Sequence, residues 1–265
     1  MSFKETEKMQ IGSCTGIENY EELCELGYDF IELAGVKVMQ MSEAELESAQ
    51  KLIAKNNIPC NGFNAYCDAG LPMAGPHFDL QKAKEYAAEI CRRGKLLGIR
   101  VIGLGSPPAR RIPEDFDRGT AAGQFKSFVR AVAEEGAKQN IMILLEALNP
   151  NICDLVTSTP EALEIVREFN MPNLHMLLDF HHLTQAGEDP VDIAYVMPYV
   201  KHLHIDHTLE DLRYHLKEEG IPFYRRCIAA ASACGYDGTL SIEPTASMAP
   251  FREEAGESIR ILRSM

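Results

Sequence analysis

The stretch VKHLHIDH, residues 200–207, decides how the rest of the chain is interpreted. Polar and apolar residues alternate from His202 to Asp206, and a period of two predicts a β-strand. His202, His204 and Asp206 then share one face of the strand, opposite its apolar side chains. Because burying an ionisable group without a partner is costly, this face predicts a metal ion or a polar substrate beside it.

Eight apolar segments of strand type alternate with helical patterns along the chain. Strands separated by helix-sized crossovers pair in parallel, and eight such units in about 250 residues fit a (β/α)8 barrel, the TIM barrel. An open doubly wound sheet is disfavoured because no GxGxxG motif follows the first segment. We see no linker, so residues 1–265 are predicted to form a single domain. The strand segments are 9–14, 28–34, 58–64, 100–105, 141–146, 174–179, 200–207 and 239–243.

Capping residues predict where several of the intervening helices begin. Ser42 and Glu45 have the spacing of a capping box, and Asp79 precedes a long helical pattern that ends at residue 97. The pairs Thr159–Pro160 and Asp189–Pro190 each predict a helix start, because proline is favoured in the first helical turn. Further helices are expected near residues 19–26, 120–139, 223–234 and 252–262.

The composition of the 265 residues limits the classes of partner. The net charge of −13 argues against nucleic acid, because nucleic-acid binders carry a basic patch that neutralises phosphates. No apolar run reaches the roughly 18 residues of a membrane helix, and residues 1–8 contain no apolar signal region. The eight cysteines include no CxxC pair and are expected to be reduced thiols. We therefore expect a cytoplasmic protein with no membrane partner.

Four successive predicted strands carry a metal-ligand residue at their carboxyl ends: Glu146, Asp179, His204 and Glu243. In a TIM barrel these strand ends face one shared cavity. Three carboxylates cannot crowd together in ionised form without a cation, because like charges raise one another's pKa. One imidazole and three carboxylates suit one divalent metal ion; we expect Mn²⁺ first, and Mg²⁺, Co²⁺ or Zn²⁺ are also chemically compatible.

Several motifs resemble those of the xylose-isomerase-like superfamily of barrels, the sugar phosphate isomerase/epimerase family. The GYDGTLSIEP run is the most specific of them, and the matches cover nearly the whole chain but concentrate in its second half. The matching pieces are LLE (144–146), DFHH (179–182, the D-x-x-H pattern), HLH (202–204), GYDGTLSIEP (235–244) and the loop SPPARRIP (106–113).

The resemblance implies that the four strand-end residues are the metal ligands and that Glu146 and Glu243 are also the catalytic acid/base pair. The metal would bind adjacent hydroxyl and carbonyl oxygens of a ketose and acidify the proton between them. One glutamate would remove that proton to give a metal-stabilised enediolate, and the other would return it on the opposite face. The implied protein is a divalent-metal-dependent isomerase or epimerase of a sugar or sugar phosphate.

Four further residues are candidates for contact with the small carbohydrate substrate. The resemblance implies that His182 binds substrate or lies beside the metal. Arg213 follows the seventh strand, and Arg110 follows the fourth, so either guanidinium would be placed to grip a phosphate, carboxylate or hydroxyl. Glu32 is expected to end the second strand and to face the same cavity, which makes it a candidate for a hydrogen bond to substrate. The resemblance also leaves a homo-oligomer open, since many relatives are dimers or tetramers.

Three alternatives stay open at this point. A metal-dependent dehydratase or lyase, acting on an inosose or a sugar conjugate, would use the same ligands, because it also begins with proton removal beside a carbonyl. A DNA-repair endonuclease of the same superfamily would need histidines where Ala34–Gly35 and Asn64–Ala65 stand, and a D-x-H pair that the chain lacks after His204. A non-catalytic sugar-binding barrel is disfavoured because binding alone does not need two opposed glutamates.

Overall fold

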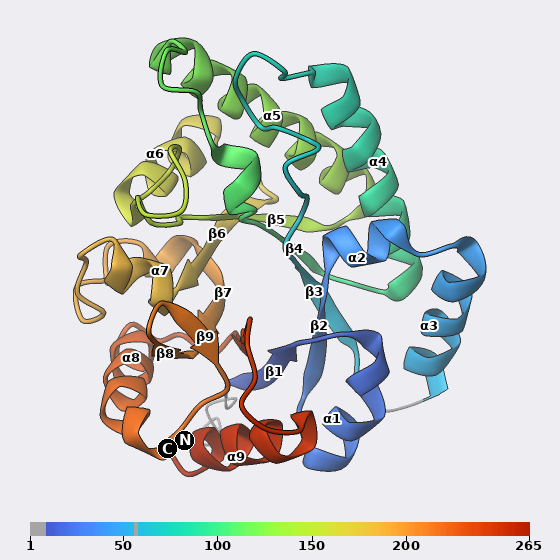
Figure 1. The fold of residues 1–265 in the computed structure, drawn as a ribbon, viewed down its shortest axis with the longest axis vertical. Coiled ribbons are helices and arrows are strands. Elements are labelled where there is room, and N and C mark those ends of the chain that lie inside the picture. The colour runs from blue at the N-terminus through green and yellow to red at the C-terminus, as the bar shows by residue number, and fades with distance from the viewer. Residues whose placement is uncertain (1–8, 56–57) are drawn as a thin grey trace, which may run out of the picture.

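The computed structural model describes residues 9–55 and 58–265, and within them the chain forms one closed barrel of parallel strands (Figure 1). Around the barrel the strands follow the order β1-β10-β7-β6-β5-β4-β3-β2. The predicted TIM barrel is therefore confirmed. The strands are β1 (Gln10–Cys14), β2 (Phe30–Ala34), β3 (Cys60–Asn64), β4 (Val101–Leu104), β5 (Met142–Glu146), β6 (Leu174–Asp179), β7 (Val200–Ile205) and β10 (Thr239–Ile242).

Helices surround the barrel and cover the outer face of its strands (Figure 1). They are α1 (Tyr20–Leu26), α2 (Gly35–Gln40), α3 (Glu43–Lys55), α4 (Leu80–Leu97), α5 (Arg118–Gln139), α6 (Thr159–Phe169), α7 (Phe180–Gln185), α8 (Ile221–Ala233) and α9 (Phe251–Arg263). Short 3-10 turns occupy Ile17–Asn19, Pro107–Arg110, Met197–Tyr199 and Glu218–Gly220. Among the described helices, none has the length and apolarity needed to cross a bilayer. The predicted absence of a signal region concerns residues 1–8, which lie outside the described residues.

The predicted helix caps of α3 and α4 are confirmed. Ser42 Oγ accepts a hydrogen bond from Glu45 N (3.3 Å), and Glu45 Oε2 accepts one from Ser42 N (2.8 Å), which is the reciprocal pattern of a capping box. Asp79 Oδ1 accepts from the backbone amides of the first turn of α4, and Gly98 ends that helix in the left-handed conformation. These contacts fix where the outer helices begin relative to the strands.

The predicted helix start at Asp189–Pro190 is wrong. The helix after β6 begins at once with α7, where Asp179 Oδ1 accepts a hydrogen bond from His181 N (2.7 Å). At Asp189 the side chain accepts from Val191 N (3.0 Å) and the carbonyl accepts from Asp192 N (3.0 Å). The Asp-Pro pair thus lies in a turn, and the helix that follows β6 is α7, which ends before Asp189.

A hairpin that the sequence patterns do not predict lies between β7 and α8. It consists of β8 (His207–Leu209) and β9 (Leu212–Tyr214), which pair antiparallel to each other beside the carboxyl end of β7 (Figure 1). Arg213 of β9 is mostly buried, whereas Leu209 and Leu212 are exposed. The hairpin therefore directs one cationic side chain toward the barrel and its apolar residues toward solvent.

The two faces of β7 differ as its alternation predicts. Leu203 and Ile205 are fully buried in the large apolar core, which also contains buried apolar side chains of the surrounding helices. His202 and His204 are fully buried too, but both rings contact the carboxylate of Glu32 across the barrel interior. The backbone of β7 pairs there with β10. The interior of this barrel is therefore polar where β7 crosses it.

Candidate metal centre

The structure brings the four predicted strand-end residues together. Glu146 ends β5, Asp179 ends β6, His204 lies next to the last residue of β7, and Glu243 follows β10 directly. The strands are neighbours in the barrel, with Asp179 paired to His204 and His204 paired to Ser241 in register. One ligand atom from each of the four lies within 4.8 Å of every other. We call Glu146, Asp179, His204 and Glu243 the strand-end cluster.

Burial and mutual repulsion separate the proton affinities of the cluster's carboxyl groups. Burial, together with the charges of Glu243 and Asp179, raises the pKa of Glu146 to about 8. Burial also acts to raise the pKa of Asp179 and of Glu243, but neighbouring positive charge, that of Arg213 first, lowers both below their usual range. The positive charge around these three carboxyl groups therefore favours ionisation of Asp179 and Glu243 but not of Glu146.

Arg213 is the cation that the hairpin adds to the cluster. Its Nη2 lies 2.6 Å from Asp179 Oδ2 and 2.7 Å from Glu243 Oε2, and its Nε lies 2.8 Å from Asp206 Oδ2. One guanidinium nitrogen thus sits between two carboxylate oxygens of the cluster. The donor set fits a divalent cation, because carboxylate oxygens and an imidazole nitrogen are ligands of such ions and here lie within one small volume.

His182 lies beside the cluster. The Asn149 amide donates to His182 Nδ1 (3.1 Å), so that Nε2 points toward Glu146 Oε1 (3.8 Å) and Asp179 Oδ2 (3.9 Å). Burial lowers the pKa of His182 to about 4, against the opposing charge of Asp179. The side chain is therefore a neutral hydrogen-bonding group at the edge of the cluster.

The expected contact of Glu32 with substrate does not fit its position. Its carboxylate is fully buried and lies 2.8 Å from His202 Nε2 and 3.2 Å from His204 Nε2. The Ser241 hydroxyl donates to the same carboxylate at 2.6 Å. Glu32 lies two residues before the end of β2, so its side chain points into the barrel beneath the cluster instead of into the mouth.

Arg110 also differs from its expected role. It is fully buried, and its guanidinium donates to the backbone carbonyls of Glu146 (2.9 Å) and Leu104 while lying over the ring of Phe125 at 5.0 Å. These contacts join the carboxyl ends of β4 and β5. Arg110 therefore supports the strand that carries Glu146, and no part of it is exposed to a substrate.

The sequence profile of the family described as Xylose isomerase-like TIM barrel matches residues 20–265. The chain belongs to this family.

Several known proteins similar to this chain are enzymes named for sugars or related compounds. D-psicose 3-epimerase of Ruminiclostridium cellulolyticum is 24% identical over 251 residues, covering 92% of this chain and 82% of that protein. 3-dehydroshikimate dehydratase of Bacillus anthracis is 35% identical over 82 residues, which are 31% of this chain and only 28% of that protein. The solved structure of 3-keto-D-glucoside 4-epimerase from E. coli has a TM-score of 0.80 at 16% identity, covering 97% of this chain and 100% of that one.

Two asparagines of this xylose isomerase-like barrel were not singled out as site residues in the sequence. Asn64 ends β3, and its amide donates to Glu243 Oε1 (2.6 Å); Asn149 orients His182 as described above. In the sequence, Asn64 stands out only as a position where a DNA-repair endonuclease would have histidine. Its place at a strand end was the available signal, because strand ends meet at one mouth in this fold.

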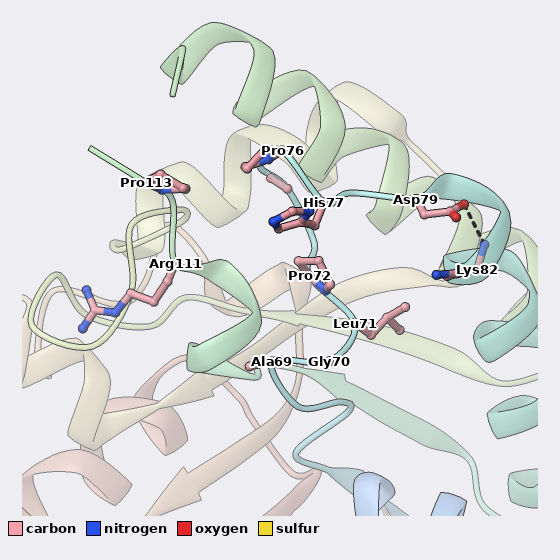
Figure 2. A pocket seen from close by; sticks show the side chains of 11 residues that line it. Ala69, Gly70, Leu71, Pro72, Pro76, His77, Asp79, Lys82, Arg111 and Pro113 are labelled. Carbon is pink, nitrogen blue, oxygen red and sulfur yellow. Dashed lines mark hydrogen bonds between the residues drawn. The ribbon is translucent and has the colours of Figure 1, made fainter. Parts of the chain in front are cut away.

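Two hollows lie at the ends of these strands. One, of about 380 Å³, borders Cys14, Asn64 and Pro244 and has apolar walls from β2 and α2. Asn64 donates a hydrogen bond to Glu243, and Pro244 follows Glu243 in the chain, but no residue of the cluster itself lines this hollow. The other, also about 380 Å³, lies between the segments after β3 and β4, and no cluster residue lines it (Figure 2).

Proposed function

We propose that this protein is a divalent-metal-dependent epimerase or isomerase of a sugar or sugar phosphate, which removes a proton from the carbon beside a carbonyl group. The observation that carries the proposal is the convergence of the strand-end cluster at the mouth of the barrel. The likeness to D-psicose 3-epimerase over 92% of the chain supports a sugar as the substrate. Carbohydrate metabolism in the cytoplasm is the setting that we propose with it.

The strand-end cluster would hold one divalent cation, with Mn²⁺ expected first and Mg²⁺, Co²⁺ or Zn²⁺ compatible with the same ligands. When bound, such an ion supplies Lewis acidity to oxygen atoms of a substrate. The ligand types fit: each member of the cluster offers a carboxylate oxygen or an imidazole nitrogen, and these atoms share one small volume. Arg213 shows that the same volume accepts positive charge.

Glu146 and Glu243 are proposed as the acid/base pair. They come from β5 and from the end of β10, with β6 and β7 between them, and so they approach the site from two sides. Asn64 holds Glu243 by donating to Oε1, which leaves Oε2 directed at His204 and the cluster. One carboxylate placed on each side of a carbon is what removal and return of a proton with inversion requires.

His182 and Arg213 are proposed as the substrate-binding residues. His182 presents its neutral Nε2 to the cluster, and Arg213 presents a guanidinium from the hairpin. Hydrogen bonds from these groups would orient the hydroxyl or phosphate oxygens of a sugar beside the glutamates.

A metal-dependent dehydratase is the second candidate, supported by the 35% identity to 3-dehydroshikimate dehydratase over 82 residues. Elimination of water also begins with proton removal beside a carbonyl, so the same glutamates would serve. A DNA-repair endonuclease is not favoured, because Asn64 stands at a predicted histidine position and donates to Glu243.

The test is incubation of the Mn²⁺-loaded protein in D₂O with ketoses, ketose phosphates, inososes and 3-dehydroshikimate, followed by NMR. We expect deuterium at the carbon beside the carbonyl together with an epimeric or isomeric product. Loss of water from a substrate would instead favour the dehydratase. Absence of exchange and of product with every substrate, while metal is bound, would contradict both enzymes and favour a sugar-binding barrel.

A further inference from the structure

A fourth carboxylate, that of Glu32, lies directly beneath the strand-end cluster. Glu32 of β2 reaches across the barrel interior, and its carboxylate faces His202 Nε2 at 2.8 Å, His204 Nε2 at 3.2 Å and the Ser241 hydroxyl at 2.6 Å. Glu32, His202, His204 and Ser241 are all fully buried. These three hydrogen-bond partners compensate the buried charge of Glu32, which would be strongly destabilising if it were unpaired.

His204 connects this carboxylate to the cluster. Its Nδ1 lies 3.0 Å from Glu243 Oε2, whereas its Nε2 lies 3.3 and 3.2 Å from the two oxygens of Glu32. An ionised carboxylate only accepts hydrogen bonds, so each ring nitrogen of His204 can donate to the carboxylate that it faces: Nε2 to Glu32 and Nδ1 to Glu243 Oε2. A divalent cation bound by Nδ1 and Glu243 would take the place of the Nδ1 proton, whereas Glu32 would keep the proton on Nε2.

The partners of Glu32 hold it in the orientation that this contact needs. Thr239 Oγ1 lies 2.6 Å from His202 Nδ1, so a hydroxyl that donates there leaves His202 Nε2–H to donate to Glu32. Ser241 Oγ donates to Glu32 Oε2 from two residues beyond Thr239 on the same strand. Glu32 is thus fixed by β7 and β10, the two strands that also place His204 and Glu243.

We propose that Glu32 is a positioning residue for the metal centre: it holds His204 as the Nε2–H tautomer, with Nδ1 free to bind a divalent cation. This inference rests on the proposed metal-dependent function. Metal-bound histidines commonly donate their other ring N–H to a carboxylate, which fixes the ring and strengthens it as a ligand, and removing that carboxylate typically weakens metal binding about 10- to 100-fold.

A second metal ion bound by Cys14, Glu32 and His204 is the competing interpretation, since their ligand atoms also lie close together. The Cys14 Sγ lies 3.9 Å from His204 Nε2. However, that nitrogen is within hydrogen-bond distance of Glu32, and Glu32 Oε2 already receives Ser241. A proton between His204 and Glu32 satisfies both groups without an ion, and metal stoichiometry separates the two interpretations.

The experiment is calorimetric titration of Mn²⁺ into chelator-stripped wild-type protein and the Glu32→Gln variant. The amide keeps the shape of the side chain but turns one acceptor into a donor, which favours the wrong tautomer of His204. We expect the dissociation constant to rise about 10- to 100-fold, with one Mn²⁺ per chain in both proteins. Turnover at saturating Mn²⁺ should fall much less than turnover at limiting Mn²⁺.

Glu254→Gln is the matched control. Glu254 of α9 is equally buried and accepts from Met248 N (3.0 Å), and among the described residues it contacts no member of the cluster. Its substitution removes a buried carboxylate without touching His204, so Mn²⁺ affinity should stay within about twofold of the wild-type value. A comparable loss in both variants would overturn the positioning role, since the effect would then be one of general destabilisation.

The outcomes distinguish the inference from the function on which it rests. If wild-type protein binds no Mn²⁺, the proposed metal centre fails. If wild-type protein binds one Mn²⁺ and Glu32→Gln binds it equally well, only the role of Glu32 fails; two ions per wild-type chain would overturn that role in favour of a site at Cys14.

A measurement on wild-type protein covers the case in which Glu32→Gln does not fold. In the zinc-loaded, ¹⁵N-labelled protein, the Nε2 proton of His204 should give a downfield resonance that exchanges slowly with solvent, because it is held in a buried hydrogen bond to Glu32. A rapidly exchanging Nε2 proton, or a proton on Nδ1 instead, would overturn the inference.

Discussion

At the residue scale, the proposed mechanism distinguishes the carboxylates that transfer a proton from those that only bind the cation. Glu146 and Glu243 are the two glutamates of the cluster, one at the end of β5 and the other after β10. Replacing either with glutamine keeps an oxygen ligand but removes the proton-accepting group. We expect Glu146→Gln and Glu243→Gln each to lower turnover about 10²- to 10⁴-fold, as is typical for loss of a general acid or base.

The measurement for this pair is product formation by NMR, with folding monitored by circular dichroism and bound Mn²⁺ by elemental analysis. Glu254→Gln again serves as the control and should retain turnover. Variants that keep full turnover with Mn²⁺ bound would show that the glutamates do not move a proton.

Arg213 carries the positive charge that balances the cluster without a metal. It pairs with Asp179, Glu243 and Asp206 while it is nearly buried. In Arg213→Met these carboxylates lose their partner, and removing one member of a buried ion pair costs about 3–5 kcal/mol. We expect the chelated variant to melt well below wild type, and Mn²⁺ to raise its melting temperature by more than it raises that of wild type.

Thermal unfolding with EDTA and with excess Mn²⁺ checks this expectation. Arg252→Met, which removes an exposed pair with Glu25, is the control and should leave the melting temperature nearly unchanged, because exposed ion pairs contribute little to stability. An identical Mn²⁺-induced shift in Arg213→Met and wild type would mean that Arg213 and the metal do not share the same carboxylates.

The residues whose positions the sequence predicts well and those whose positions it does not predict differ in how far along the strand or loop they lie. Glu146 and Asp179 are the last residues of their strands, and the cluster was predictable from that position alone. Glu32 lies two residues short of its strand end, and this difference, about 6–7 Å along a strand, places it in the interior. Arg110 is beyond its strand, and only the path of the loop decides that it folds back onto backbone carbonyls.

At the element scale, α4 holds α2 in place through a paired arginine. Arg93 Nη1 donates to the carbonyls of Val38 (2.9 Å) and Met41 (2.7 Å), and Glu89 orients it by accepting from its Nε (2.6 Å). The hydrogen bond from Arg92 is the main cause that lowers the pKa of Glu89 from 4.5 to about 2. The network thus depends on Glu89 being ionised.

Glu89→Gln is expected to lower the free energy of unfolding by about 1 kcal/mol at pH 7, the upper range for a partly exposed ion pair. Because folding lowers this pKa, its contribution is present above about pH 4.5 and is lost as the pH falls toward 2. Urea unfolding of both proteins from pH 7 to pH 3 should show the gap closing. A gap independent of pH would contradict the ionic origin, and Glu85→Gln on the same helix should change stability by less than about 0.5 kcal/mol.

The elements themselves were predictable to different degrees. The strands and the capped helices α3 and α4 follow from local patterns, because alternation and capping act within a few residues. The turn at Asp189 carries the same local signal as a helix start, and only the early start of α7 decides against it. The β8–β9 hairpin is two strands of three residues each, too short to give a periodic pattern.

At the scale of the whole molecule, barrel closure turns distant strand ends into one site. Neighbouring strands β5, β6, β7 and β10 each bring one residue to the same mouth, and β1 closes against β10 to complete the ring. Family membership over residues 20–265 and the TM-score of 0.80 agree with this architecture. Sequence patterns give the strand order of a TIM barrel, but they do not give the depth of each side chain, which depends on register between strands.

The central claim is that the strand-end cluster binds one divalent cation, and anomalous diffraction from crystals grown with Mn²⁺ tests it most directly. We expect one Mn²⁺ peak per chain, within coordination distance of Glu146, Asp179, His204 and Glu243, and we expect it to be absent from crystals of Asp179→Asn grown at limiting Mn²⁺. Crystals of the wild-type protein in saturating Mn²⁺ with no peak among these four side chains, or with the ion bound elsewhere, would contradict the claim.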